Sequence, residues 1–131
     1  MNRVSHIDFE NLADTGDILL FQTKNVAAKI QRLVTRSEYD HIALILRYNS
    51  GKVVLYESLR DQGVGICEWS KFLFNDWNKL YEKVIWRRLN FNKSSEFLST
   101  LDDFVSQTIG KPFKINASKL FRKRNDNDIA N

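Results

Sequence analysis

Two residues on neighbouring segments of this sequence could carry acid–base chemistry. His41 follows Asp40 at the start of an apolar run, and Glu57 interrupts the next apolar run along the chain. An imidazole, with an ordinary pKa of about 6.5, suits general-base catalysis, and a nearby carboxylate can orient the ring and fix its tautomer. The sequence therefore offers His41 as a general base and Glu57 as its orienting acid.

Cys67 is the one cysteine of the 131-residue chain. It excludes an intramolecular disulfide, and there is no cysteine cluster for zinc. A reactive thiol would need a lowered pKa, which a nearby cation or helix N-terminus can supply, but the adjacent Glu68 would oppose a thiolate. A lone cysteine is more often a small buried apolar residue. Cys67 is therefore a minor candidate nucleophile, and we expect neither a metal nor a cofactor.

Whether His41 and Glu57 meet depends on the hairpin between them. If residues 50–51 alone form the loop, Leu44 faces Glu57, and the acid lies on the face opposite His41. If residues 49–51 form a three-residue loop ending in a left-handed glycine, the acid shares the His41 face. Both registers remain open from the sequence.

The elements that would position these residues follow from periodicity and turn signals. Strand patterns occupy residues 18–21, 42–48, 52–59, 63–66 and 83–89, and the strand at 42–48 is apolar enough for burial on both faces. Helical patterns occupy residues 25–36, 69–74 and 94–109, with Asn25 and Ser94 as N-caps and Gly110 at the C-terminal cap. We expect an α+β fold, a mostly antiparallel sheet packed with helices, in a single domain spanning residues 1–131.

The aromatic middle of the chain predicts packing rather than a ligand cage. We expect core and rim positions for Trp69, Phe72, Phe74, Trp77, Tyr81 and Trp86.

Composition indicates an ordinary globular protein. Hydrophobic residues make up 43% of the chain and charged residues 27%, with a net charge of +4. The first residues lack the apolar run of a signal peptide, and no stretch is apolar enough for a transmembrane helix. With its single cysteine, the chain is expected to be cytoplasmic.

Several segments together resemble the circularly permuted NlpC/P60 group of papain-like proteins. The specific segments are Thr15–Phe21, which contains Gly16-Asp17, and Tyr39–Ile45, which contains His41; supporting segments are Val54–Ser58, Gly63–Ile66, Trp86–Leu89 and Ile109–Phe113. The resemblance covers about residues 12–115. This group includes bacterial lipid-hydrolase-like proteins, a poxvirus protein and, more distantly, lecithin:retinol acyltransferases.

The resemblance implies a thiol-dependent acyl hydrolase or acyltransferase acting on amides or esters. His41 matches the family's general base, and Glu57 matches its strand acid. The permutation places the nucleophilic cysteine late, on a helix after the segment that Gly110-Lys111-Pro112-Phe113 matches, and no cysteine follows here. We expect a chain cut before that helix; the alternatives are a degenerate member and a role taken over by Cys67.

A binding or structural module without catalysis is the alternative function. Basic residues could meet an anionic membrane surface, or a protein partner could bind. These residues are Lys29, Arg32 and Arg36 in the predicted helix and Lys119, Arg122, Lys123 and Arg124 in the polar tail at 116–131. That tail could also be a loop leading to a further segment. We do not expect nucleic-acid binding, because no recognised module is present.

Overall fold

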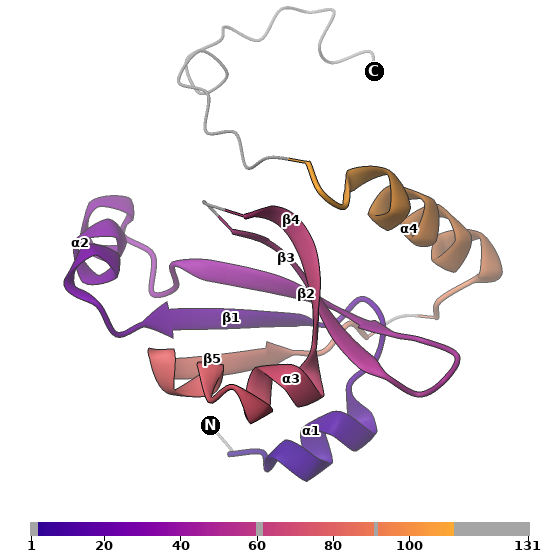
Figure 1. The fold of residues 1–131 in the computed structure, drawn as a ribbon, viewed down its shortest axis with the longest axis horizontal. Coiled ribbons are helices and arrows are strands. Elements are labelled where there is room, and N and C mark those ends of the chain that lie inside the picture. Colours follow the sequence, from indigo (N-terminus) through magenta and orange to yellow (C-terminus); the bar gives the residue numbers. More distant parts are fainter. Residues whose placement is uncertain (1–2, 60–61, 91, 112–131) are drawn as a thin grey trace, which may run out of the picture.

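A computed structural model of the chain describes residues 3–59, 62–90 and 92–111. Within these ranges the strands are β1 (Ile18–Thr23), β2 (His41–Arg47), β3 (Val53–Leu59), β4 (Gly63–Glu68) and β5 (Tyr81–Arg87). The helices are α1 (His6–Leu12), α2 (Val26–Thr35), α3 (Trp69–Phe74) and α4 (Ser95–Thr108), with a short 3₁₀ helix, η1 (Trp77–Leu80). Figure 1 shows the arrangement.

The described strands form one five-stranded sheet in the order β4-β3-β2-β1-β5. Every neighbouring pair is antiparallel. Helices lie on both sides of this sheet: α1 and α3 on one side, α4 on the other (Figure 1). The predicted α+β class and antiparallel sheet are therefore confirmed.

The main core lies between the sheet and the layer of α1 and α3. It joins Leu19, Phe21, Ala43, Ile45 and Leu55 of the strands to Phe9, Trp69 and Phe72 of the helices. The aromatic prediction holds for these buried rings but is wrong for Phe74, which is 87% exposed at the end of α3.

The second core is smaller and lies under α4. Val105 of α4 packs with Leu46 and Val54 of the sheet. The cluster does not extend to the start of β2, and Ile42 is 53% exposed. The prediction that this strand is buried on both faces is therefore wrong at Ile42.

Local capping follows the sequence signals. The Asn25 side chain accepts a hydrogen bond from the Ala28 amide at 2.7 Å, and the Ser94 hydroxyl accepts one from the Phe97 amide at 3.0 Å. Gly110 follows the last residues of α4 with φ +84°, in the left-handed region that glycine favours. The two predicted N-caps are confirmed.

The last strand is shifted from its predicted position. It was expected at residues 83–89 but runs from Tyr81 to Arg87. Leu89 leaves the ladder because its amide donates to the Asp17 carboxylate instead, at 2.8 Å. At the other end, the Lys24 amide donates to the Leu80 carbonyl at 3.0 Å, which ties η1 to the end of β1.

The predictions for the chain's end lie outside the described residues. They concern the segment from Pro112 onward, including the basic residues of the tail. None of the described helices combines the length and apolar character that crossing a bilayer requires.

Candidate functional site

The hairpin between β2 and β3 turns through three residues, Asn49, Ser50 and Gly51. The Tyr48 amide donates to the Lys52 carbonyl at 2.9 Å, and Gly51 adopts φ +87°. The paired residues then run from Arg47 opposite Val53 to Leu44 opposite Tyr56. One step further, this register sets Ala43 opposite Glu57 and so brings Glu57 to the His41 face. Of the two registers that the sequence permitted, the structure has the one with the three-residue loop.

His41 and Glu57 form a hydrogen-bonded pair on the core face of the sheet. His41 Nε2 and Glu57 Oε2 are 2.7 Å apart, and only 17% and 13% of the two side chains are exposed. Because a carboxylate can only accept, this contact assigns the proton to Nε2 of the neutral ring. Nδ1 then carries a free lone pair, and it has no hydrogen-bond partner among the described residues. The arrangement leaves one ring nitrogen held and the other able to accept a proton.

An adjacent polar cluster fixes the start of β2. The Asp40 carboxylate accepts from the Thr23 amide at 2.9 Å and from the Thr23 hydroxyl, and it pairs with the Arg32 guanidinium. Burial alone would raise the pKa of Asp40, but the Thr23 and Arg32 contacts outweigh it and lower the pKa. Asp40 is therefore ionised near neutral pH, and it links α2, β1 and β2 directly before His41.

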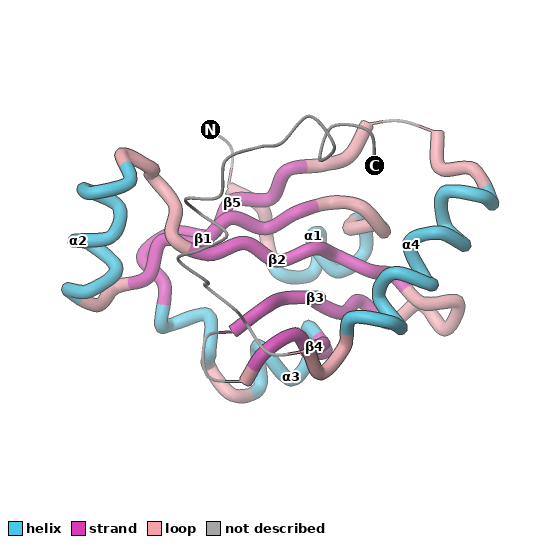
Figure 2. The backbone as a smooth tube through the Cα atoms, turned by 90° about the horizontal axis from the view of Figure 1, so that it is seen from above, coloured by secondary structure: helices cyan, strands magenta, loops and turns pink. Residues whose placement is uncertain are grey.

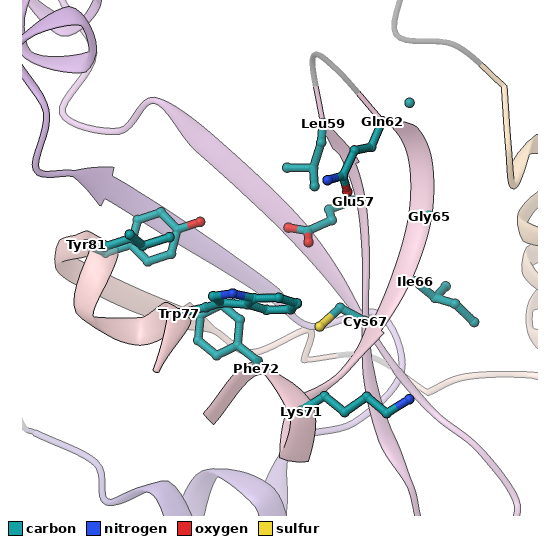
Figure 3. A pocket seen from close by; sticks show the side chains of 12 residues that line it. Glu57, Leu59, Gln62, Gly65, Ile66, Cys67, Lys71, Phe72, Trp77 and Tyr81 are labelled. Carbon is teal, nitrogen blue, oxygen red and sulfur yellow. The ribbon is translucent and has the colours of Figure 1, made fainter. Parts of the chain in front are cut away.

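A groove runs along both sides of this pair. One hollow of about 500 Å³ is lined by Glu57, Cys67, Phe72 and Trp77 among others, and Figure 3 shows these side chains. A second hollow of about 650 Å³ contains His41 and is bordered by Lys24 and Asn25. Leu59, Leu80 and Tyr81 line both hollows, so the two adjoin each other. Glu57 lines one hollow and His41 the other, and together we call the two hollows the groove.

Tyr81 lines the groove, although the sequence did not suggest it as a catalytic residue. Its ring packs 4.6 Å from that of Phe21, and its hydroxyl lies on the Glu57 side of the hollow (Figure 3). Burial, followed by the negative charge of Glu57, raises the pKa of Tyr81 to about 12. The phenol is therefore a neutral hydrogen-bond donor at the groove. Its sequence context, inside an aromatic-rich segment, predicted only packing.

Cys67 lies in β4 opposite Leu55, with its sulfur directed into the same hollow (Figure 3). Burial raises the pKa of its thiol and the Glu57 charge adds to this effect, although Lys71 partly opposes both. Its neighbour Glu68 acts in the same direction as Glu57, as its position in the sequence suggested. The thiol is close to the pair but is placed where its ionised form is disfavoured.

The Thr15-Gly16-Asp17 segment directly precedes β1, at the end of this strand that is farther from the groove. The Asp17 carboxylate is 2% exposed and accepts from Trp86 Nε1 at 3.0 Å and from the Leu89 and Asp14 amides. Gly16 has φ +97°, and a Cβ there would lie 2.4 Å from the Leu89 side chain. The left-handed conformation favours glycine, and any side chain at this position would displace the end of Leu89. This motif therefore holds β5 to β1 and does not face the groove.

The described residues offer no ready metal site. No three His, Cys, Asp or Glu side chains among them gather as ligands around one point. The His41–Glu57 pair supplies only two side chains that could bind a metal ion.

The fold matches a solved structure. The sequence matches no protein-family profile and no curated protein. A crystal structure of the metalloprotein YiiX from Escherichia coli O157:H7 (DUF1105) superposes with a TM-score of 0.60 at 24% sequence identity, over 77% of this chain. The match covers 53% of that structure's chain, so this chain spans about half of YiiX. At this identity the likeness shows the α+β fold with its five-stranded antiparallel sheet.

Proposed function

We propose that this chain carries the base and orienting acid of a thiol-dependent acyl hydrolase or acyltransferase of the permuted NlpC/P60 type. The observation that carries the proposal is the 2.7 Å bond between His41 Nε2 and Glu57 Oε2 beside a groove. The bond holds the ring in one tautomer and leaves Nδ1 as the basic atom. The YiiX-like fold and the sequence resemblance support the same assignment.

The proposed reaction is acyl transfer to a thiol. His41 Nδ1 accepts the thiol proton as the sulfur attacks the carbonyl carbon of an amide or ester, and a C–S bond forms. The imidazolium then gives this proton to the leaving amine or alcohol as the C–N or C–O bond breaks. Water, deprotonated by the same nitrogen, releases the acid and regenerates the thiol. Glu57 stabilises the imidazolium in both halves of the reaction.

Tyr81 suits a supporting role in this chemistry. Its pKa of about 12 keeps the phenol protonated throughout the working range of an imidazole base. A neutral donor at the groove could bind the substrate carbonyl oxygen, where negative charge develops during attack.

The mechanism also needs a residue that supplies the nucleophilic thiol. Cys67 is the only cysteine in the sequence, and its raised pKa makes it a weak nucleophile where it stands. The family resemblance places the nucleophile in a segment C-terminal to Gly110. We therefore assign no nucleophilic role to Cys67.

The protein purified from its own source provides the test. Incubation with an activated ester such as p-nitrophenyl butyrate, followed by intact-mass measurement and peptide mapping, shows whether an acyl group is attached and to which residue. We expect a thioester on a cysteine other than Cys67, and its loss in His41→Ala.

Two outcomes would contradict the proposal. An acyl group mapped to Cys67 that persists in His41→Ala would show a thiol that reacts without the proposed base. A native mass of 15.4 kDa without acylation would favour the rival function, a binding module that keeps the fold without the chemistry.

A further inference from the structure

Helix α2 turns its apolar side away from the protein. Val26, Ile30, Leu33 and Val34 fall within an arc of about 100° on the helix, by the 3.6-residue repeat. All four are exposed, by 71%, 55%, 78% and 77% respectively. The helix contacts the rest of the chain from the opposite side, through buried Ala28 and through Arg32, which pairs with Asp40. A surface helix usually turns its apolar side toward the core, whereas α2 turns its apolar side toward solvent.

The position of α2 leaves this stripe open to an outside partner. Figures 1 and 2 both place the helix at one end of the sheet, outside the layers formed by α1, α3 and α4. Four large apolar side chains gathered on one projecting helix go beyond the scattered exposure that is normal on a protein surface.

Every charged residue in the segment 24–36, which carries the stripe, is basic. Residues 24–36 contain Lys24, Lys29, Arg32 and Arg36 and no acidic residue. Arg32 is directed inward, but the other three are exposed. Lys29 forms only a half-exposed pair with Glu82 at 3.4 Å, and the described residues hold no ion pair for Lys24 or Arg36. By helical position, Lys29 lies beside one edge of the apolar stripe, and Arg36 lies at the C-terminal cap of the helix.

We propose that α2 docks the protein on an anionic lipid surface. Its apolar stripe would enter the boundary between headgroups and acyl chains, while Lys24, Lys29 and Arg36 meet anionic headgroups. A helix with a large apolar moment, cations at the edge and no acidic residue is suited to this environment. Lys24 and Asn25 also border the His41 hollow, so docking holds the groove close to the lipid surface.

The charge pattern favours lipid over a second copy of the chain. Two α2 helices packed stripe to stripe would bring their exposed cations together with no acid on either helix to offset them. Anionic headgroups supply the opposite charge that the helix itself lacks.

Vesicle flotation tests the docking. The full chain is mixed with phosphatidylcholine vesicles with and without phosphatidylglycerol, at low and high salt. We expect flotation with the anionic vesicles, weakened by salt because the cations contribute. Ile30→Gln with Leu33→Gln should weaken binding by about tenfold or more, since two apolar side chains no longer enter the lipid. Lys24→Gln with Arg36→Gln should reduce the preference for anionic vesicles.

A matched control is available on α1. Ile7 and Leu12 are 72% and 53% exposed, close to the values for Leu33 and Ile30, but they share their helix with acidic Asp8 and Glu10. Ile7→Gln with Leu12→Gln should float like the original chain. If the α2 double variant melts early, the single change Leu33→Gln, at the most exposed position, carries the test.

Three results would overturn the proposal. Flotation could be absent, or the α1 control could lose as much binding as the α2 variant. Alternatively, light scattering could show a dimer that Leu33→Gln dissolves while vesicles bind nothing, which would make a second copy the occupant. His41→Ala should leave flotation unchanged, so docking and the proposed chemistry fail independently.

Discussion

Two carboxylates on the core face of the same sheet have different surroundings. Asp17, before β1, accepts from an indole and two backbone amides and is 2% exposed. Glu57, in β3, bonds to the His41 imidazole beside the groove, and the other ring nitrogen has no partner among the residues that the structure describes. The first has fixed donors that cannot change protonation state near neutral pH. The second bonds to the side chain that we propose as a general base.

This difference suggests that Asp17 stabilises the fold, whereas Glu57 acts in the proposed reaction. An acid that fixed donors surround stabilises one conformation, and its removal leaves those donors unsatisfied in the core. An acid that orients a titratable ring affects what the ring does, so its removal should affect rate more than folding. Asp40 lies between the two cases, because its partners are fixed but it adjoins His41 in sequence.

The largest effect on stability is expected at Asp17. Asp17→Ala would leave the Trp86 indole and the Leu89 and Asp14 amides without their hydrogen-bond acceptor. We therefore expect a loss of about 3 kcal/mol in the free energy of unfolding. Chemical denaturation measures it. A loss below about 1 kcal/mol would break the comparison, because Asp17 would then be no more structural than an ordinary surface acid.

Glu57→Gln should show the opposite balance. The amide oxygen can still accept from His41 Nε2, so we expect less than about 1 kcal/mol of lost stability. The uncharged side chain no longer stabilises the imidazolium, and ester hydrolysis by the native protein should fall by about tenfold to a hundredfold. Unfolding as severe as that of Asp17→Ala, with an unchanged rate, would reverse the roles assigned to the two acids.

Asp40→Asn tests the intermediate case through pH. The pKa of Asp40 is lower in the folded chain than in the unfolded one, so the stability it adds is present above about pH 4. That stability is lost as the pH falls through the folded pKa. Melting temperatures across acid pH should therefore fall more steeply for the original chain than for Asp40→Asn. Parallel curves would show that Asp40 does not contribute to folding through its charge.

The smallest effect is expected at Cys67. Burial and Glu57 raise the pKa of its thiol, so iodoacetamide should alkylate it more slowly at pH 8 than it alkylates an exposed cysteine. Glu57→Gln removes one of these causes and should speed alkylation by about threefold, because a larger fraction of the thiol is then ionised. Equal rates in both proteins would place Glu57 too far from the sulfur to influence it.

The sequence predicted most elements and the identity of the central pair, but left its geometry open. His41 and Glu57 could be chosen from residue type and position, whereas their contact depended on a three-residue loop at Gly51. A one-residue difference in that loop reverses every side chain of a strand. The pair was therefore permitted by the sequence and placed only by the structure.

Local patterns in the sequence could not predict several other features of the structure. Asp17 finds its donors 69 and 72 residues away, at Trp86 and Leu89, so its sequence neighbours indicated only a turn. Periodicity identified the apolar stripe of α2 but not its direction, because the same spacing describes a stripe that faces inward or outward. Tyr81 was expected only to pack, and it lines the groove at the start of β5, which begins two residues earlier than predicted.

The most direct test of the central claim compares the two histidines of the chain. His6 packs against Trp69 on α1, away from the groove, and provides the matched control. In the native protein, we expect His41→Ala to lower p-nitrophenyl butyrate hydrolysis by about a hundredfold or more, while His6→Ala keeps the original rate. Equal rates for both variants, or no hydrolysis above buffer in the original protein, would contradict the assignment of His41 as a general base.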